Sequence, residues 1–324
     1  MSELKKIPVI LDADTGVDDT MALLLAAQHP MLNVLAITAT FGNTTTDFAT
    51  KNTLNALAMC GREDIPVAAG TPVPWKKVLR TSPYIHGDNG VGEYEYPENH
   101  TAALSGEYAW DLTYRKIMEH PEKVNYIAQG PLTNLATMLR KYPEVKDRLD
   151  KVIYMGGELR GDSAGSQCAS VNVFHDPDAA QYVLKAGLDF HLCSGGAVTS
   201  NVVFGWEELE EHFGDWGEEG RAILHMLGYY FGKCGAFEGE AKKMPIHDTP
   251  VIMYLVEPEC FTTERVRCEV ELDGPETYGY SLIDLYNLGN WSEEEKNIHY
   301  VRVKADKTEY LARRILKGIR GEIV

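Results

Sequence analysis

Residues 7–19 read Ile7-Pro8-Val9-Ile10-Leu11-Asp12-Ala13-Asp14-Thr15-Gly16-Val17-Asp18-Asp19, an apolar run that leads into a turn with four carboxylates. A run of Val, Ile and Leu without polar alternation predicts a strand that is buried on both faces, as in a parallel sheet. Gly16 permits the tight turn, and the apolar residues after Asp19 predict a helix. The acids therefore lie beyond the carboxyl end of a strand, where open α/β sheets bind ligands.

Two interpretations of these acids are open. Asp18 and Asp19 could cap free N–H groups at the start of the helix. Capping does not account for Asp12 and Asp14, whose mutual repulsion beside a buried strand costs stability unless a cation offsets it. Hard cations such as Ca²⁺ bind about six to eight oxygen ligands, carboxylates among them. The pattern therefore favours a metal site over capping alone.

Strands and helices alternate along most of the chain. After the first strand, predicted strands cover residues 34–39, 65–69, 124–129, 152–157 and 188–193, with predicted helices between them that include 103–118 and 176–184. The segment 206–237 is predicted to be helical, and a strand pair (266–272 and 299–303) and a helix (306–317) follow. This order predicts one α/β domain over residues 1–324, a doubly wound, mostly parallel open sheet of Rossmann-like type flanked by helices.

The charge balance excludes several classes of partner. The 324 residues include 48 acids and 31 bases, which gives a formal net charge of −17. Nucleic acids and anionic membranes both require basic surface, so neither is an expected partner. No apolar run approaches the roughly 20 residues of a membrane span, and no apolar signal segment precedes the first strand. We therefore expect a cytoplasmic protein with a small neutral or cationic ligand.

Polar groups in two other stretches are candidate site residues. A long loop over residues 70–101 contains His86-Gly87, and a later segment contains His247-Asp248 before Pro250. His86 could be an incidental loop histidine, and Asp248 could simply cap a helix. A histidine beside a carboxylate could equally be a proton donor beside a metal ligand. The aromatic-rich segment 206–237 is similarly either core or a cover over an aromatic ligand.

Together these motifs resemble the inosine–uridine nucleoside hydrolase family over essentially the whole chain. The family opens with D-x-D-P-G-x-D-D after a buried strand, and here residues 12–19 match except for Thr15 in place of Pro. The other matches, in chain order, are Gly42-Asn43, His86-Gly87, Gly130-Pro131-Leu132-Thr133-Asn134, Met155-Gly156-Gly157, Asn172 with Asp176-Pro177, and His247-Asp248. The resemblance implies hydrolysis of the N-glycosidic bond of ribonucleosides to free base and ribose. It also implies a homo-oligomer, a dimer or a tetramer.

The resemblance further implies a bound Ca²⁺ held by Asp14, Asp19, Asp248 and the main-chain carbonyl of Gln129. Asp14 would act as the general base that activates a calcium-bound water, and His247 would protonate the leaving base. The remaining site residues would contact the nucleoside or support those that do: Asp12, Asp18, Asn43, His86 and Asn172.

One part of the family pattern is missing here. Two residues before Asn172 the family usually has a Glu that binds the ribose 5′ hydroxyl, whereas this chain has Ser170. The loop over 161–167 also departs from the family. We expect an altered substrate preference at the 5′ end, with Asp162 or a loop hydroxyl as the replacement.

Two other functions compete with nucleoside hydrolysis. Haloacid-dehalogenase-type phosphatases have D-x-D-x-T/V after a strand, and Asp12 and Asp14 fit that spacing, but Gly16 stands where Thr or Val is required. A non-catalytic nucleoside- or sugar-binding protein on the same fold would have no need of Asp14 and His247 together. The sequence leaves the preference for purine or pyrimidine bases open.

Overall fold

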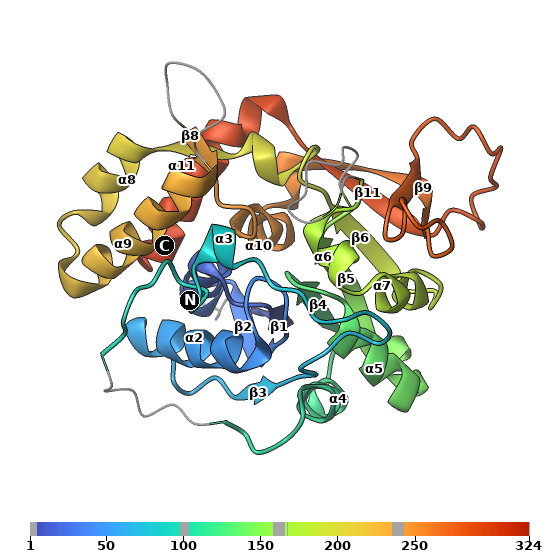
Figure 1. Cartoon of the computed structure of the whole chain (residues 1–324), viewed down its shortest axis with the longest axis horizontal. Helices are drawn as coiled ribbons and strands as arrows, with labels where there is room; N and C mark the ends of the chain where they lie inside the picture. The colour runs from blue at the N-terminus through green and yellow to red at the C-terminus, as the bar shows by residue number, and fades with distance from the viewer. Residues whose placement is uncertain (1–4, 98–103, 158–165, 167, 235–242, 324) are drawn as a thin grey trace.

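The computed structural model describes residues 5–97, 104–157, 166, 168–234 and 243–323. Its centre is a sheet of nine strands in the order β10-β9-β11-β6-β5-β4-β1-β2-β3 (Figure 1). The strands are β1 (Ile7–Ala13), β2 (Leu32–Ala39), β3 (Val67–Ala69), β4 (Val124–Ala128), β5 (Leu149–Met155), β6 (Asp189–Cys193), β9 (Phe261–Val270), β10 (Ser281–Asp284) and β11 (Ile298–Val303). Neighbours pair in parallel except at β9, which is antiparallel to both β10 and β11. The prediction of a mostly parallel, doubly wound sheet is confirmed.

Helices cover both faces of this sheet. Along β1, Val9 and Leu11 belong to one core cluster and Ile10 to the other, and all three are fully buried. The first face is covered by α1 (Val17–Gln28), α2 (Thr46–Met59), α9 (Gly217–Cys234), α10 (Thr249–Val256) and α11 (Thr308–Ile319), and the second by α4 (Ala109–Glu119), α5 (Thr133–Lys141) and α7 (Pro177–Leu184). Burial on both sides explains why β1 lacks polar alternation.

Shorter elements complete the structure. They are α3 (Pro83–His86), α6 (Val171–His175), α8 (Trp206–Phe213), the two-stranded sheet of β7 (Val203–Gly205) and β8 (Lys243–Pro245), and 3-10 turns at Pro143–Arg148, Thr199–Asn201, Pro258–Cys260 and Ala305–Lys307. In Figure 1, α8 and α9 lie together at the left, and α6 and α7 are seen beside β5 and β6. No helix in the described part of the chain is long and apolar enough to cross a membrane.

Two predicted helices differ from the structure. The helix predicted over 103–118 begins only at Ala109, because Gly106 has a φ of +78°, which no helix accommodates. The segment predicted as one helix over 206–237 forms two helices, α8 and α9, separated by a turn at residues 214–216. The second helix begins at Gly217, whose φ is +62°. Residues 235–237 lie outside the described residues. β10, a short edge strand with little apolar pattern, is not predicted by the sequence.

Candidate active site

The acids of the first motif lie where β1 meets β4. The strand order is β3-β2-β1-β4-β5-β6. From β1 the chain first proceeds to β2 and β3 on one side, and then to β4, β5 and β6 on the other, so the switch point lies between β1 and β4. Ligands bind at such a switch point, outside the carboxyl ends of the strands. Asp12 lies in β1, and its carbonyl accepts a 2.8 Å hydrogen bond from the N–H of Gln129, just beyond β4. The turn after β1 then places Asp14 and the first residues of α1 above this switch point.

Four acids from two distant segments meet there. Carboxylate oxygens of Asp18, Asp19 and Asp248 lie within 4.8 Å of one another. Asp248 immediately precedes α10, and α10 packs against α1, which begins beside Asp18 and Asp19. Asp14 is fully buried next to this group, and its charge helps to raise the pKa of Asp248. We call Asp14, Asp18, Asp19 and Asp248 the acid cluster.

Hydrogen bonds to the acid cluster occupy one side of its carboxylates. The backbone N–H of Asn43 donates to Asp14 Oδ2 at 2.7 Å, and its side-chain amide donates to Asp19 Oδ2 at 2.7 Å. The N–H of Gly16 also donates to Asp19 Oδ2, at 2.9 Å. Asn43 therefore fixes the relative positions of two acids, which extends the role in ribose binding that the family resemblance implies for it.

The other side of the cluster lacks partners. The Oδ1 atoms of Asp14, Asp18, Asp19 and Asp248 are all buried without a hydrogen-bond partner among the described residues. Buried polar atoms in folded proteins are nearly always paired with protein, water or an ion. Converging carboxylate oxygens are the donor set that hard divalent cations prefer. The residues present therefore fit a bound cation such as Ca²⁺.

Burial and mutual repulsion make the acid cluster costly to ionise. Burial, followed by the charge of Asp18, raises the pKa of Asp19 to about 7. The pKa values of Asp14 and Asp248 lie well above the usual range, because of burial first and the charge of Asp19 second. The sequence predicted repulsion between Asp12 and Asp14, whereas in the structure the charges that raise the pKa of Asp14 are those of Asp19 and Asp18. A cation in their midst would offset this repulsion.

Glycines let the main chain approach Asp14 from two sides. Gly42 has a φ of +151°, and a Cβ built on it would lie 2.0 Å from Asp14 Oδ2. A Cβ on Gly130, which follows Gln129, would lie 2.9 Å from the Asp14 carboxyl carbon. Both distances are shorter than side chains tolerate, so these positions of the Gly42-Asn43 and Gly130-Pro131 motifs have a steric explanation.

Asp12 lies in β1, two residues before Asp14, and is held within the sheet by hydrogen bonds. Its Oδ1 accepts hydrogen bonds from Thr38 Oγ1 at 2.7 Å and from Asn134 Nδ2 at 2.8 Å. Burial raises the pKa of Asp12 to about 6, while these two hydrogen bonds oppose the shift. Asn134 also donates to the carbonyl of Ala39, so it connects α5 to the ends of β1 and β2.

Gln129 and Asn172 meet at another side of the cluster. The side-chain amide of Asn172 donates to the carbonyl oxygen of Gln129 at 2.5 Å and to that of Met155 at 3.1 Å. The side-chain amide of Gln129 donates to the carbonyl of Asp248 at 3.3 Å. The predicted ligand carbonyl of Gln129 is thus adjacent to Asn172, and α6, which carries Asn172, borders the site.

The two candidate histidines lie near each other beside the acids. His86 is buried, and its Nδ1 accepts the N–H of Val17 at 3.3 Å and lies 3.8 Å from Asp18 Oδ1. Burial lowers the pKa of His86, and a charge on His247 lowers it further. The neutral ring therefore carries its proton on Nε2. His247 is half-buried, and its Nδ1 hydrogen-bonds Thr199 Oγ1 at 2.7 Å, which fixes the ring orientation.

Tyr230 is a site residue that the sequence analysis did not single out. Its hydroxyl donates to Asp18 Oδ2 at 3.2 Å, and its ring lies against His86 with centroids 5.5 Å apart. It belongs to α9, within the aromatic-rich segment whose sequence is compatible with either core packing or a cover over a ligand. Tyr230 is buried in the core and also contacts the site, and nothing in a single sequence distinguishes it from the neighbouring Tyr229.

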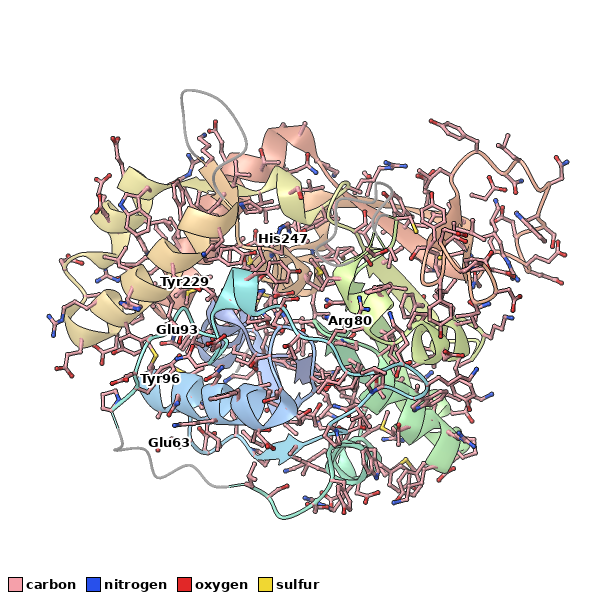
Figure 2. The ribbon with its side chains drawn as sticks, in the orientation of Figure 1. Glu63, Arg80, Glu93, Tyr96, Tyr229 and His247 are labelled. Atoms are coloured by element: carbon pink, nitrogen blue, oxygen red, sulfur yellow. The ribbon has the colours of Figure 1, made fainter. Side chains whose placement is uncertain are left out.

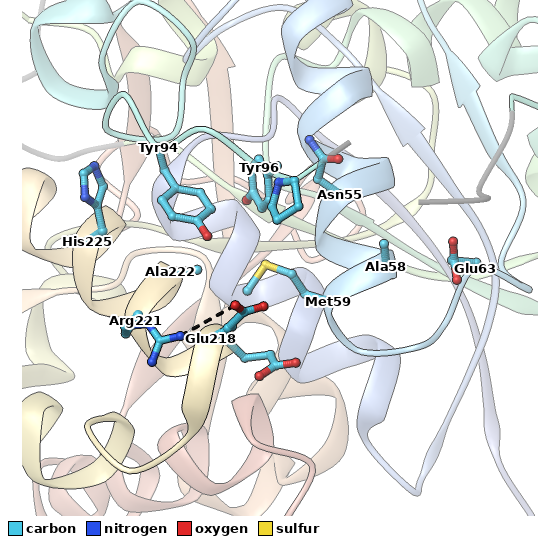
Figure 3. A pocket seen from close by; sticks show the side chains of 12 residues that line it. Asn55, Ala58, Met59, Glu63, Tyr94, Tyr96, Glu218, Arg221, Ala222 and His225 are labelled. Carbon is cyan, nitrogen blue, oxygen red and sulfur yellow. Dashed lines mark ion pairs between the residues drawn. The ribbon is translucent and has the colours of Figure 1, made fainter. Parts of the chain in front are cut away.

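The region predicted to hold the 5′ end is only partly described. Ser170 is buried, and its hydroxyl accepts a 2.8 Å hydrogen bond from the N–H of Gly157. Asp162 lies outside the described residues. A separate cavity of about 490 Å³ between α2 and α9 is lined in part by Tyr94 and Tyr96 (Figure 3). None of its lining residues belongs to the acid cluster, so this cavity is not the site of the chemistry.

Comparisons with known proteins agree with this geometry. The sequence matches the model of the inosine-uridine preferring nucleoside hydrolase family over residues 9–312. A pyrimidine-specific ribonucleoside hydrolase of Citrobacter koseri is 32% identical over 282 residues, 87% of this chain and 89% of the relative. The inosine-uridine preferring nucleoside hydrolase of Leishmania major is 31% identical over 277 residues, 85% of this chain and 87% of the relative.

Solved structures agree as well. A purine-preferring ribonucleoside hydrolase from Gardnerella vaginalis superposes with a TM-score of 0.86 at 26% identity, covering 98% of this chain and 99% of the other. A plant nucleoside hydrolase superposes with a TM-score of 0.84, also at 26% identity. These matches leave no support for a phosphatase or a non-catalytic binding protein. The chain therefore belongs to the inosine-uridine preferring nucleoside hydrolase family and is an N-glycosyl hydrolase that converts ribonucleosides to free base and ribose.

Proposed function

We propose that Asp14 is the general base of this hydrolysis and that the acid cluster binds Ca²⁺ and the ribose diol. The observation that carries the proposal is the set of four buried Oδ1 atoms, one on each acid of the cluster, that lack partners in the described structure. Asp14, Asp19, Asp248 and the Gln129 carbonyl would hold the ion. A bound Ca²⁺ would supply positive charge that keeps the neighbouring carboxylates ionised and makes a nearby water more acidic.

The chain's own residues divide the remaining work. Asp14 removes a proton from the attacking water, because its Oδ1 is unoccupied while Oδ2 is fixed by Asn43. Asp18, Asn43 and Asn172 bind the ribose hydroxyls, with Asp12 behind them. The ionised carboxylates also stabilise the positive charge that develops at the anomeric carbon in an oxocarbenium-like transition state.

The histidines face the leaving base in this proposal. His247 donates the proton that the departing nitrogen requires, and Thr199 orients its ring through Nδ1. His86, with its proton on Nε2, contacts the leaving base on the side opposite His247. Tyr230 lies between His86 and Asp18 and contributes to excluding water.

A panel of natural ribonucleosides tests the substrate class. Inosine, guanosine, adenosine, uridine and cytidine are incubated with the calcium-loaded protein, and free ribose is measured. We expect ribose release from at least one of them, and the ranking also reveals the base preference. Release of inorganic phosphate from phosphate esters without any ribose release from nucleosides would contradict the proposal.

Substitution of His247 by alanine tests the proton donor. We expect kcat for natural nucleosides to fall by about 10²- to 10⁴-fold, as for loss of a general acid. Hydrolysis of a riboside whose leaving group needs no proton, such as 4-nitrophenyl riboside, should change by less than about tenfold. The matched control is Thr199→Val, which keeps the imidazole and removes only its Nδ1 partner. Equal losses on both substrates in the alanine variant would exclude proton donation as the role of His247.

We also propose a cytoplasmic homo-oligomer, a dimer or a tetramer. The five described cysteines, at positions 60, 168, 193, 260 and 268, are all free, which suits a reducing compartment. Tyr286 and Leu288 are 85% and 80% exposed, which is apolar surface of the kind that subunit contacts bury. Light scattering of the purified protein measures its mass in solution.

A further inference from the structure

A segment over residues 75–82 crosses the edge of the site between two of its elements. At one end, the N–H of Trp75 donates to Asp176 Oδ2 at 2.9 Å, directly after α6. At the other end, the N–H of Ser82 donates to the carbonyl of Asn43 at 3.1 Å. Since Asn43 holds the acid cluster and α6 carries Asn172, this segment joins two sides of the site. Figure 2 labels Arg80 on this segment.

Basic groups gather where this segment meets α6. The ammonium of Lys77 donates to the carbonyl of Phe174 at 2.5 Å and lies 3.0 Å from the centroid of its ring. The guanidinium of Arg80 lies 5.8 Å from the same ring. The next residue, His175, is only 6% exposed, and its Nδ1 has no hydrogen-bond partner in the described structure. We call Lys77, Arg80 and His175 the basic group.

Two neighbouring cations, Lys77 and Arg80, stand out in a protein with a net charge of −17. Among the described residues neither Lys77 nor Arg80 forms an ion pair, whereas the adjacent Lys76 pairs with Asp178 at 2.5 Å. The charge of Asp176 acts to raise the pKa of Lys77, but the two do not form an ion pair. Both carboxylate oxygens of Asp176 already accept hydrogen bonds from backbone N–H groups. Burial and the charge of Arg80 lower the pKa of Lys77 to about 8.

Capping of a helix end accounts for only part of this arrangement. A lysine that donates to a carbonyl at the end of α6 is an ordinary cap. That explanation covers Lys77, but neither the second cation at Arg80 nor the unpartnered buried nitrogen of His175. Two cations that form no ion pair among the described residues, beside a buried imidazole that can donate from its protonated nitrogen, are groups that bind an anion.

The position of the basic group matches one end of the substrate. In the proposed function, the ribose diol lies on the acid cluster and the base lies at His86 and His247. The carbon that bears the base is next to the 2′ hydroxyl, and the carbon that bears C5′ is next to the 3′ hydroxyl. C5′ therefore projects from the opposite end of the diol, which we place toward α6. The described residues 166 and 168–175 include no carboxylate that would repel an anion there.

We propose that the preferred substrate carries an anionic group on C5′, a phosphate ester, and that Arg80, Lys77 and His175 bind it. This inference rests on the proposed function, because it uses the same orientation of the ribose. In the reaction, the bond from C1′ to the base nitrogen breaks and a bond from C1′ to the water oxygen forms. One proton of the water goes to Asp14, and the base receives one from His247. The products are free base and ribose 5-phosphate, and the phosphate ester stays intact.

The test compares paired substrates. The calcium-loaded protein is given uridine and uridine 5′-monophosphate, and inosine and inosine 5′-monophosphate, and kcat/KM is measured from release of the free base. We expect the monophosphate of at least one pair to exceed its nucleoside by about tenfold or more, the scale of one charge-assisted hydrogen bond. Detection of ribose 5-phosphate, rather than ribose, shows that the ester was not removed first.

Variants assign the effect to the basic group. Arg80 is exposed, so the Arg80→Gln variant should fold. We expect this variant to have a ratio of kcat/KM for the monophosphate to kcat/KM for the nucleoside that is about tenfold lower than in the parent protein. Lys77→Met keeps the apolar stem and should lower the same ratio. The matched control is Lys76→Gln, an exposed neighbour that pairs with Asp178, which should leave the ratio unchanged.

The outcomes separate the two proposals. Nucleosides cleaved as well as or better than their monophosphates would overturn the inference and leave the proposed function intact. Cleavage of neither, with calcium binding retained, would overturn the proposed function as well. Inorganic phosphate is the probe in a second experiment, in which it competes with the monophosphate for the protein. Inhibition by phosphate that becomes weaker in the Arg80→Gln variant supports the anion site. Competition that Arg80→Gln leaves unchanged would count against it.

Discussion

Replacement of Asp14 by asparagine should lower kcat for every accepted substrate by about 10²- to 10⁴-fold, the range for loss of a general base. Asparagine keeps the size of the side chain, and its amide oxygen can still accept the N–H of Asn43. What it loses is a proton acceptor on the Oδ1 side, where the described structure offers no partner. Initial rates at saturating substrate and calcium measure the effect.

Stability separates this loss from misfolding. Asp14 has a pKa well above its usual range because of burial and the charge of Asp19, so removing its charge relieves repulsion in the cation-free protein. We therefore expect the cation-free Asp14→Asn variant to melt no lower than the parent protein. Asp47→Asn, in the exposed first turn of α2, should change neither activity nor stability. Undiminished turnover in Asp14→Asn would rule out the general-base assignment.

Removal of divalent cations by a chelator should abolish activity, with a fall of at least about 10²-fold, because a metal ion contributes several kcal/mol to such a reaction. Calcium added back should restore it. Four acids with unpartnered oxygens suit a large ion with many oxygen ligands better than Mg²⁺, which requires strict octahedral geometry. Full activity after exhaustive chelation, verified by elemental analysis, would contradict a metal-dependent mechanism.

The cation-free protein should also become less stable as the pH rises. The pKa of Asp12 is raised to about 6 and that of Asp19 to about 7, against about 3.9 in an unfolded chain. The folded state therefore binds more protons than the unfolded state between pH 4 and pH 7, and folding free energy is lost across that interval as the pH increases. We expect Tm to fall by roughly 5–10 °C from pH 5 to pH 7.5.

Calcium should reverse this trend. At a free concentration of one hundred times Kd, a ligand that binds only the folded state stabilises it by about 2.7 kcal/mol. Because protonated carboxylates are poor ligands, the increase in Tm should be larger at pH 7.5 than at pH 5. Thermal melts at both pH values, with chelator or with calcium, give the comparison. A calcium effect that is equal at the two pH values would show that these carboxylates are not the ligands.

The sequence predicted the site best where one segment carries both the strand and its chemistry. Residues 7–19 contain an unbroken apolar run and the acids that follow it, so the buried strand and the acids at its carboxyl end could both be inferred. Asp248 was recognised only through its family motif, since nothing in its own segment distinguishes a metal ligand from a helix cap. The structure places it within 4.8 Å of Asp18 and Asp19.

Other features depended on contacts that a single sequence does not encode. Tyr230 is one of several aromatics in α9, and its hydrogen bond to Asp18 follows from how α9 packs over α3 and α1. The hydrogen bonds of Asn43 to two acids depend on the φ of +151° at Gly42. The two cations at Lys77 and Arg80, which form no ion pair among the described residues, come together only because the loop packs against α6.

The distance along the chain between the acids has a consequence for biosynthesis. Asp14, Asp18 and Asp19 leave the ribosome early, whereas Asp248 precedes α10 in the last third of the chain. Domains generally fold as units, and N-terminal domains fold first during translation. The acid cluster is therefore incomplete until α10 docks on α1, and a cation that requires all four carboxylates can be retained only in the finished fold.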